Sequence, residues 1–236
     1  AKAMEKHYRG RYEDVAGRIA AHYIEGGDHQ QAATYAIQAG RRAANLAAWA
    51  EAAGFYEQAL SAEPDPASKK DILMALGEAY NRGGQPSKAA ETYRTVISTA
   101  KPGSLDIDQA RLALAQALLP QSRFAEVLGL TQQVIENGHS KLLLQAEFLA
   151  GTALSLEGAD LDAAAAHLHR AESKCLEECS PLMLAEIKFE RGSLAAQQGA
   201  LDKAVALYQD SLEAAKMAFA GGTNNRAIPR LVLAYN

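Results

Sequence analysis

The chain has 236 residues, of which 48% are hydrophobic and 22% are charged, and its formal net charge at pH 7 is −4. This composition supplies enough apolar material for an extended core, which excludes a disordered chain, and the acidic balance gives no electrostatic reason to bind nucleic acid directly. No stretch comes near the ~18 to 20 consecutive apolar residues that a membrane helix needs, so we expect no membrane partner. Strong helix formers dominate and strand-forming alternation is scarce, which predicts an all-α protein with more than about two thirds of its residues in helices.

Similar helical segments recur along the chain. Small or apolar landmark residues at Ala52, Ala89, Val127, Ala164 and Ala204 follow one another at intervals of 37 to 40 residues. A period of this length indicates an array of antiparallel helix pairs, each stacked on the next. We expect one such array over residues 1–236, with pairs at 12–45, 29–62, 67–100, 106–137, 141–176 and 181–220 and a further, truncated repeat starting at 223–236.

The first helix of each later pair carries a small residue between apolar ones. A glycine inside an exposed helix costs about 1 kcal/mol relative to alanine, so its recurrence at one phase requires a reason. We expect close packing of the two helices of a pair, with a small landmark residue of the second helix lying opposite. The small residues of the first helices are Gly77, Ala115, Gly151 and Gly192.

Two segments resemble the tetratricopeptide repeat (TPR) family. One carries Leu76, Gly77 and Tyr80 followed by Gly84, Ala89 and Tyr93, and the other carries Trp49, Ala52, Tyr56, Ala59 and Pro64. The period exceeds the family's usual length of about 34 residues. Longer repeats of this kind resemble the MalT-like helical domains of large bacterial multidomain regulators, and residues 18–60 resemble the helices that follow the ATPase module of such proteins.

The resemblance implies a fold and a class of function. It implies a right-handed superhelix of helix pairs, an α-solenoid, which is a fragment of a larger signalling or transcriptional regulator. Such a module binds a protein or peptide partner, or a neighbouring domain of its own chain, and it is compatible with a homodimer. A small-molecule inducer sensor is the alternative function that a MalT-like domain would permit.

The first helices of such an array line a concave groove, and their side chains that face away from the second helices meet the partner. Phe148 and Phe189 occupy corresponding positions, which indicates an apolar track for a partner's side chains unless both pack against the neighbouring repeat. The groove is expected to be lined by Ile37, Arg41, Asn45, Asp71, Met74, Glu78, Asn81, Arg82, Leu112, Gln116, Gln145, Phe148, Thr152, Ser155, Glu186, Phe189, Ser193 and Gln197.

No catalytic, phosphate-binding or zinc-binding motif occurs, so the sequence predicts a non-enzymatic protein without a cofactor. His167, His169, Cys175 and Cys179 are the one group of possible metal ligands. We favour packing and surface roles for all four, because two histidines that are two residues apart on a helix point in different directions. Two cysteines are too few for a disulfide framework, and we therefore expect a protein of the reducing cytoplasm.

Overall fold

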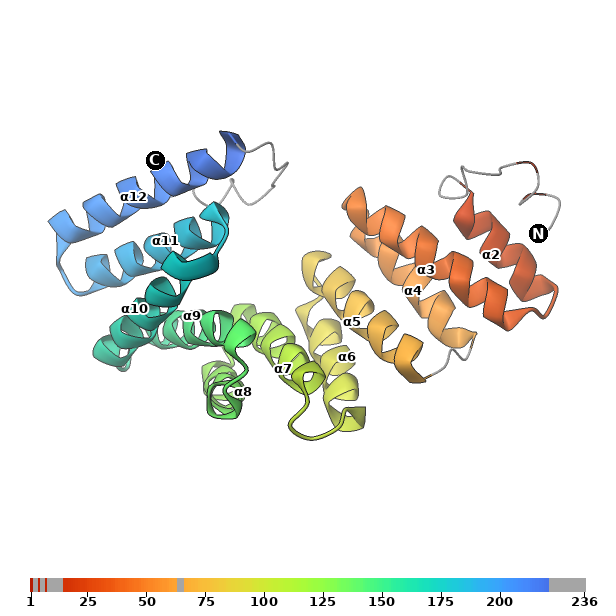
Figure 1. Cartoon of the computed structure of the whole chain (residues 1–236), viewed down its shortest axis with the longest axis horizontal. Coiled ribbons are helices and arrows are strands. Elements are labelled where there is room, and N and C mark those ends of the chain that lie inside the picture. The colour runs from red at the N-terminus through yellow and green to blue at the C-terminus, as the bar shows by residue number, and fades with distance from the viewer. Residues whose placement is uncertain (2–3, 5–6, 8–14, 63–65, 221–236) are drawn as a thin grey trace. The chain divides into compact units, whose positions relative to one another are not determined.

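The computed structural model describes residues 1, 4, 7, 15–62 and 66–220 (Figure 1). Of these residues 86% are helical and none lies in a strand, which confirms the predicted all-α fold class. The predicted further repeat at 223–236 lies outside the described residues. Among the described helices, none combines the length and the apolar character that crossing a bilayer requires.

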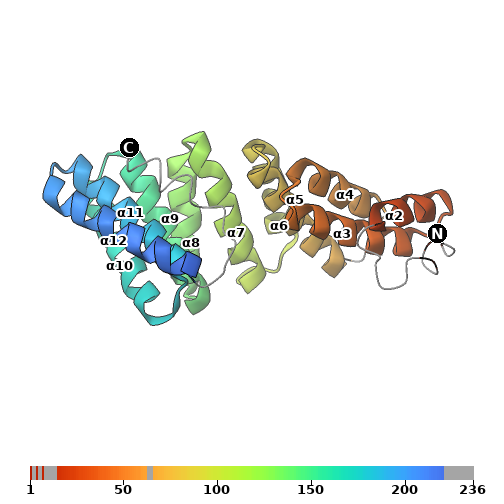
Figure 2. The same ribbon diagram turned by 90° about the horizontal axis from the view of Figure 1, so that it is seen from above.

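The chain divides into two compact units, residues 1–121 and 122–236. In the first unit each helix packs against the one that follows it in sequence, as the ribbon shows for α3 and α4 (Figure 2). The helices of this unit are α2 (Ala16–Glu25), α3 (His29–Asn45), α4 (Trp49–Ser61), α5 (Pro66–Arg82), α6 (Pro86–Thr99) and α7 (Leu105–Leu118), and a short 3-10 helix follows at Leu119–Gln121.

The second unit is built in the same way, with sequential packing from α8 to α12. Its helices are α8 (Phe124–Asn137), α9 (Ser140–Glu157), α10 (Leu161–Glu178), α11 (Pro181–Gln197) and α12 (Leu201–Ala220). The sequence predicted a single array in which residues 106–137 form one pair. In the structure this segment contains α7, the last α-helix of the first unit, and α8, the first helix of the second unit, and the arrangement of all pairs in one array stays a prediction.

Local capping explains where the helices of the second unit start and stop. The Asp160 side chain accepts a hydrogen bond from the Ala163 amide at the start of α10, and Ser180 caps the amide of Met183 at the start of α11. Such caps satisfy amides that have no partner inside the helix. At the end of α9 Gly158 has φ +74°, a left-handed conformation that is inexpensive only without a Cβ.

The glycines inside the first helices set the distance between the two helices of a pair. A Cβ built at any of four such glycines would lie 2.5 to 2.8 Å from a side-chain carbon of the second helix, which is too close to be tolerated without movement. The predicted close packing is therefore confirmed, but its partner differs from the expectation. The glycine meets the large side chain four residues after the small landmark, and not the landmark itself, in the pairs Gly40 with Tyr56, Gly77 with Tyr93, Gly151 with Leu168 and Gly192 with Tyr208.

Candidate partner-binding surface

Most of the predicted groove residues of the first unit lie on α3 and α5, and two more, Leu112 and Gln116, lie on α7. Arg41 and Asn45 of α3 are exposed, and neither side chain has a hydrogen bond or ion pair within the described residues. On α5, Arg82 donates from Nε to Glu78 Oε1 at 2.8 Å, and its guanidinium carbon lies 5.4 Å from the centroid of the Trp49 ring. This part of the surface therefore combines one paired and one unpaired arginine.

The other predicted residues of α3 and α5 are less uniform. Asp71 is exposed and lies 3.6 Å from Lys70 Nζ, while Asn81 is half-buried. Ile37 and Met74 are half-buried, and Met74 packs against a core cluster between α5, α6 and α7. Unit 1 thus presents mainly charged and amide side chains beside a small apolar strip.

Two tyrosines of the second helices pack against glycines of α3 and α5. Tyr56 of α4 and Tyr93 of α6 are 3% and 4% exposed, and their rings cross the first helices at the glycines. Burial raises the pKa of Tyr56, which Arg41 lowers and Glu78 raises. Burial also raises the pKa of Tyr93. The sequence analysis missed these hydroxyl groups, although a tyrosine sixteen residues after a first-helix glycine marks both of them.

The two phenylalanines of the predicted apolar track are half-buried, and both pack inside the second unit. Phe148 contacts the cluster around Leu168 and the cluster around Ile187, so it lies among α9, α10 and α11. Phe189 packs against a cluster of alanines from α11 and α12, and its ring centroid is 5.5 Å from that of Tyr208. Phe148 therefore packs partly against the neighbouring pair, whereas Phe189 packs against the second helix of its own pair.

Three predicted groove residues are buried. Leu112 is 1% exposed, Thr152 is 7% exposed and Ser155 is 3% exposed. The Thr152 hydroxyl donates to the carbonyl of Phe148 at 2.9 Å, and Ser155 Oγ accepts from Gln197 Nε2 at 3.2 Å. We therefore remove these three residues from the candidate surface. The remaining predicted positions are exposed at Gln116 and Gln197 and half-buried at Gln145, Glu186 and Ser193.

The two histidines of the possible metal group have different surroundings. His167 Nδ1 is 2.6 Å from Glu147 Oε2, and Arg170 donates from Nε to Glu147 Oε1 at 3.0 Å, so His167 belongs to an ion-pair cluster between α9 and α10. His169 is exposed. Within the part of the chain that the structure describes, no three histidine, cysteine or acidic residues are grouped as a metal ion would require.

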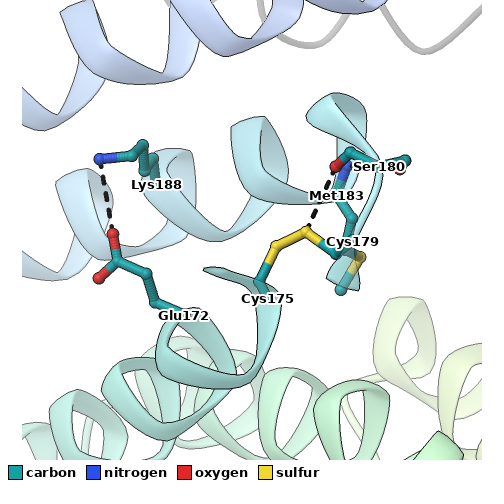
Figure 3. Close-up of a disulfide and its surroundings, with 6 residues drawn as sticks. All are labelled: Glu172, Cys175, Cys179, Ser180, Met183 and Lys188. Atoms are coloured by element: carbon teal, nitrogen blue, oxygen red, sulfur yellow. Dashed lines mark hydrogen bonds and ion pairs between the residues drawn. A yellow bond between two sulfur atoms is a disulfide. The ribbon is translucent and has the colours of Figure 1, made fainter. Parts of the chain in front are cut away.

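The cysteines differ from the expectation of two separate packing residues. Cys175 and Cys179 are joined by a disulfide across the last turn of α10, with their Cα atoms 4.8 Å apart (Figure 3). Cys175 is buried in the cluster that also contains Ile187. The bridge closes so short a segment that it constrains only the junction of α10 with α11. Nearby, Glu172 of α10 lies 3.5 Å from Lys188 of α11 (Figure 3).

One hollow of about 250 Å³ lies at the start of α8, and it is lined by residues 122–126 together with Glu157. This volume is below the ~300 to 1,000 Å³ of typical small-molecule sites. The hollow and the candidate surface of α3 and α5 lie in different units.

Comparison with known proteins finds solved structures of similar fold. No protein-family model matches the chain, and no curated protein matches it in sequence. Among solved structures, BtubC (BKLC) from P. vanneervenii aligns with 91% of this chain and 93% of its own, at a TM-score of 0.64 and 18% identity. TTC0263, a thermophilic TPR protein in Thermus thermophilus, aligns with 86% of this chain and 96% of its own, at a TM-score of 0.62 and 20% identity.

A third structure is YrrB, a TPR protein with an unusual peptide-binding site. It aligns with 83% of this chain and 91% of its own, at a TM-score of 0.53 and 17% identity. At such low identities the likeness shows the fold alone. The chain has a TPR-like helical repeat fold.

Proposed function

We propose that this chain is a non-enzymatic interaction module that binds a protein or peptide partner on the first-helix side of α3 and α5. The observation that carries the proposal is the pair of exposed polar side chains of Arg41 and Asn45 on α3, which have no hydrogen bond or ion pair within the described residues, together with the exposed Glu78–Arg82 pair on α5 of the same unit. Side chains without internal partners cost little to redirect toward a ligand. The TPR-like fold supports the proposal, because stacked helical repeats offer extended surfaces of this kind.

A charge-reversal experiment tests the proposal. The chain is immobilised and challenged with a cell lysate of its source, and a partner that it retains is purified for affinity measurement. The double variant Arg41→Glu with Asn45→Ala should bind that partner at least tenfold more weakly, the effect of losing a hot spot. Lys203→Glu is the matched control, because Lys203 is an exposed cation on α12, in the other unit. Equal affinity of the double variant and the parent would exclude this surface.

The sequence resemblance extends the proposal to a role inside a larger bacterial regulator of MalT-like type, with a neighbouring domain of the same chain or a second copy as further possible partners. This extension rests on residues 18–60 and on the length of the repeat. The small-molecule sensor stays a prediction from the same resemblance. Trp49, the single tryptophan, would report either kind of ligand because it lies under the Arg82 guanidinium.

A further inference from the structure

The Cys175–Cys179 disulfide has one buried and one accessible end. Cys175 is 4% exposed and lies in the core cluster with Ala171 and Ile187, whereas Cys179 is half-buried at the edge of that cluster. Cys179 Sγ lies 3.4 Å from the carbonyl oxygen of Ser180, the residue that caps α11 (Figure 3). A thiol that approaches from solvent therefore meets Cys179 Sγ first, and accessible disulfides are the ones that exchange readily with external thiols.

The bridge ties the residue that ends α10 back onto the body of the helix. Cys179 has φ −129° and ψ 165°, so the chain is extended at this residue. Four residues of a continuing α-helix would advance by about 6 Å along the helix axis. The Cα atoms of Cys175 and Cys179 are only 4.8 Å apart. The bridge thus holds Cys179 closer to the last turn than a regular helix would.

The end of α10 lacks the glycine that ends the two preceding helices. α8 ends at Gly138 with φ +71°, and α9 ends at Gly158 with φ +74°, left-handed conformations that close the last turn of a helix. α10 ends instead at Cys179. Pro181 stops the helix whether or not the bridge is formed, because the residue before a proline avoids the helical region. The bridge therefore determines how firmly the last turn is held and not where the chain turns.

Other contacts between α10 and α11 do not depend on the bridge. Glu172 of α10 forms ion pairs with Lys188 and Arg191 of α11, nearly a full turn before Cys175. Ala171 and Ile187 pack in the shared core cluster through carbon atoms alone. Opening the bridge should therefore loosen the junction of the two helices while the rest of the pair stays packed.

We propose that this bridge is a redox-responsive site, which exchanges with a dithiol reductant at Cys179 Sγ and whose state sets how firmly the last turn of α10 is held against α11. A thiolate of the reductant attacks Cys179 Sγ, the S–S bond breaks, and Cys175 Sγ leaves with the electron pair and takes a proton. The second thiol of the reductant then displaces Cys179 Sγ, which also takes a proton. Two electrons thus pass from the dithiol, which becomes a disulfide, to the two cysteines, which become thiols. The site is independent of the proposed interaction function.

Thiol trapping tests the exchange. The full oxidised chain is incubated with dithiothreitol, free thiols are alkylated with iodoacetamide, and mass spectrometry counts them. The bridge should open while the circular dichroism spectrum keeps its helical minima. Cys179 in the variant Cys175→Ala should be alkylated about tenfold or more faster than Cys175 in the variant Cys179→Ser, because only Cys179 is accessible.

Hydrogen exchange tests the structural consequence. Reduction of the parent should raise the amide exchange rates of residues 173–183 by about tenfold or more, because a cross-link over so short a loop restricts its open states by roughly that factor. The rates in α3 and α4, which belong to the other unit, should not change. Cys179→Ser is the matched control and should exchange like the reduced parent with or without dithiothreitol. If that variant does not fold, Cys175→Ala supplies the same comparison.

Three results would overturn the proposal. A bridge that dithiothreitol opens only after the chain has unfolded would exclude an exchange site. Unchanged exchange rates in residues 173–183 after reduction, or an equal rise over all described helices, would exclude a local role at the junction. Two free thiols in the folded chain after incubation with oxidised glutathione would exclude the bridge itself.

Discussion

The glycines of the first helices carry a steric requirement that differs from one glycine to the next. At Gly77 the space of a Cβ is taken by the Tyr93 ring, and at Gly192 it is taken by the Tyr208 ring. Gly54, also inside a helix, has nothing within 4 Å of the same position. The residue type is the same, but only the first two glycines are needed for packing.

Gly77→Leu and Gly192→Leu should each lower the free energy of unfolding by roughly 1 to 3 kcal/mol or more, because a tyrosine ring packed against the glycine must move to admit the new side chain. Urea denaturation followed by circular dichroism measures the change. Gly54→Ala is the control and should raise stability by about 0.5 to 1 kcal/mol, since it adds helix propensity at an open position. Unchanged midpoints for both leucine variants would show that the rings yield freely.

Tyr80 should ionise unusually late. Burial, together with the hydrogen bond to Glu57, raises its pKa from the ordinary value near 10 to about 12. The native state therefore favours the protonated phenol, and the resulting stabilisation is present below pH 10 and is lost as the pH rises from 10 to about 12.

The difference in absorbance at 295 nm between the parent and Tyr80→Phe isolates this group, because the other eight tyrosines are common to both proteins and cancel. The difference should titrate with a midpoint near 12. The melting temperature of the parent should also fall more steeply above pH 10 than that of the variant. A difference midpoint at pH 10 would contradict the environment that the structure gives Tyr80.

At the scale of helices, the all-α class can be predicted from the sequence, whereas the side-chain partners cannot. The turn glycines and the serine and aspartate caps are local signals, and observed helices begin or end at them. The side chain that packs against each first-helix glycine comes from another helix. The sequence predicts the small landmark residue at this contact, whereas the structure places there the large residue four positions later.

For the candidate surface, too, the sequence predicts some properties and not others. Helical phase alone finds the exposed residues Arg41, Glu78 and Arg82, because one face of a helix repeats every three or four positions. It does not separate them from Thr152 and Ser155, which lie at the same phase and are buried. The burial of Thr152 and Ser155 depends on how closely the first helix of the next pair approaches α9. The sequence of α9 alone does not determine that distance.

Phe148 should act as a packing anchor of α9. The side chain touches two clusters that include Leu168, Leu194 and Ile187, so Phe148→Ala should cost about 2 to 4 kcal/mol of unfolding free energy, near the lower end for phenylalanine because the ring is only half-buried. Leu156→Ala, at an exposed position near the end of the same helix, should change stability by no more than about 0.5 kcal/mol. Equal stabilities of the parent and Phe148→Ala would return this ring to the partner-binding surface.

At the scale of the whole chain, the two units present different first-helix surfaces. The candidate residues of the first unit are mainly charged and amide side chains, whereas those of the second unit include two half-buried aromatic rings, one of them beside Tyr208, whose hydroxyl donates to Ser193.

Hydrogen exchange should show how damage spreads through such an array. Each helix packs mainly against its sequence neighbours, so a substitution at one pair weakens the adjacent helices first and more distant ones less. In Gly77→Leu the amide exchange rates should rise most in α5 and α6 and then in α4 and α7, whereas in Gly192→Leu they should rise most in α11 and α12 and then in α10. Mass spectrometry of peptic fragments measures both patterns under conditions in which each variant remains folded. Because the two variants have their centres in different units, each serves as the control for the other, and an equal rise over all described helices in both would mean that the chain unfolds as one cooperative block.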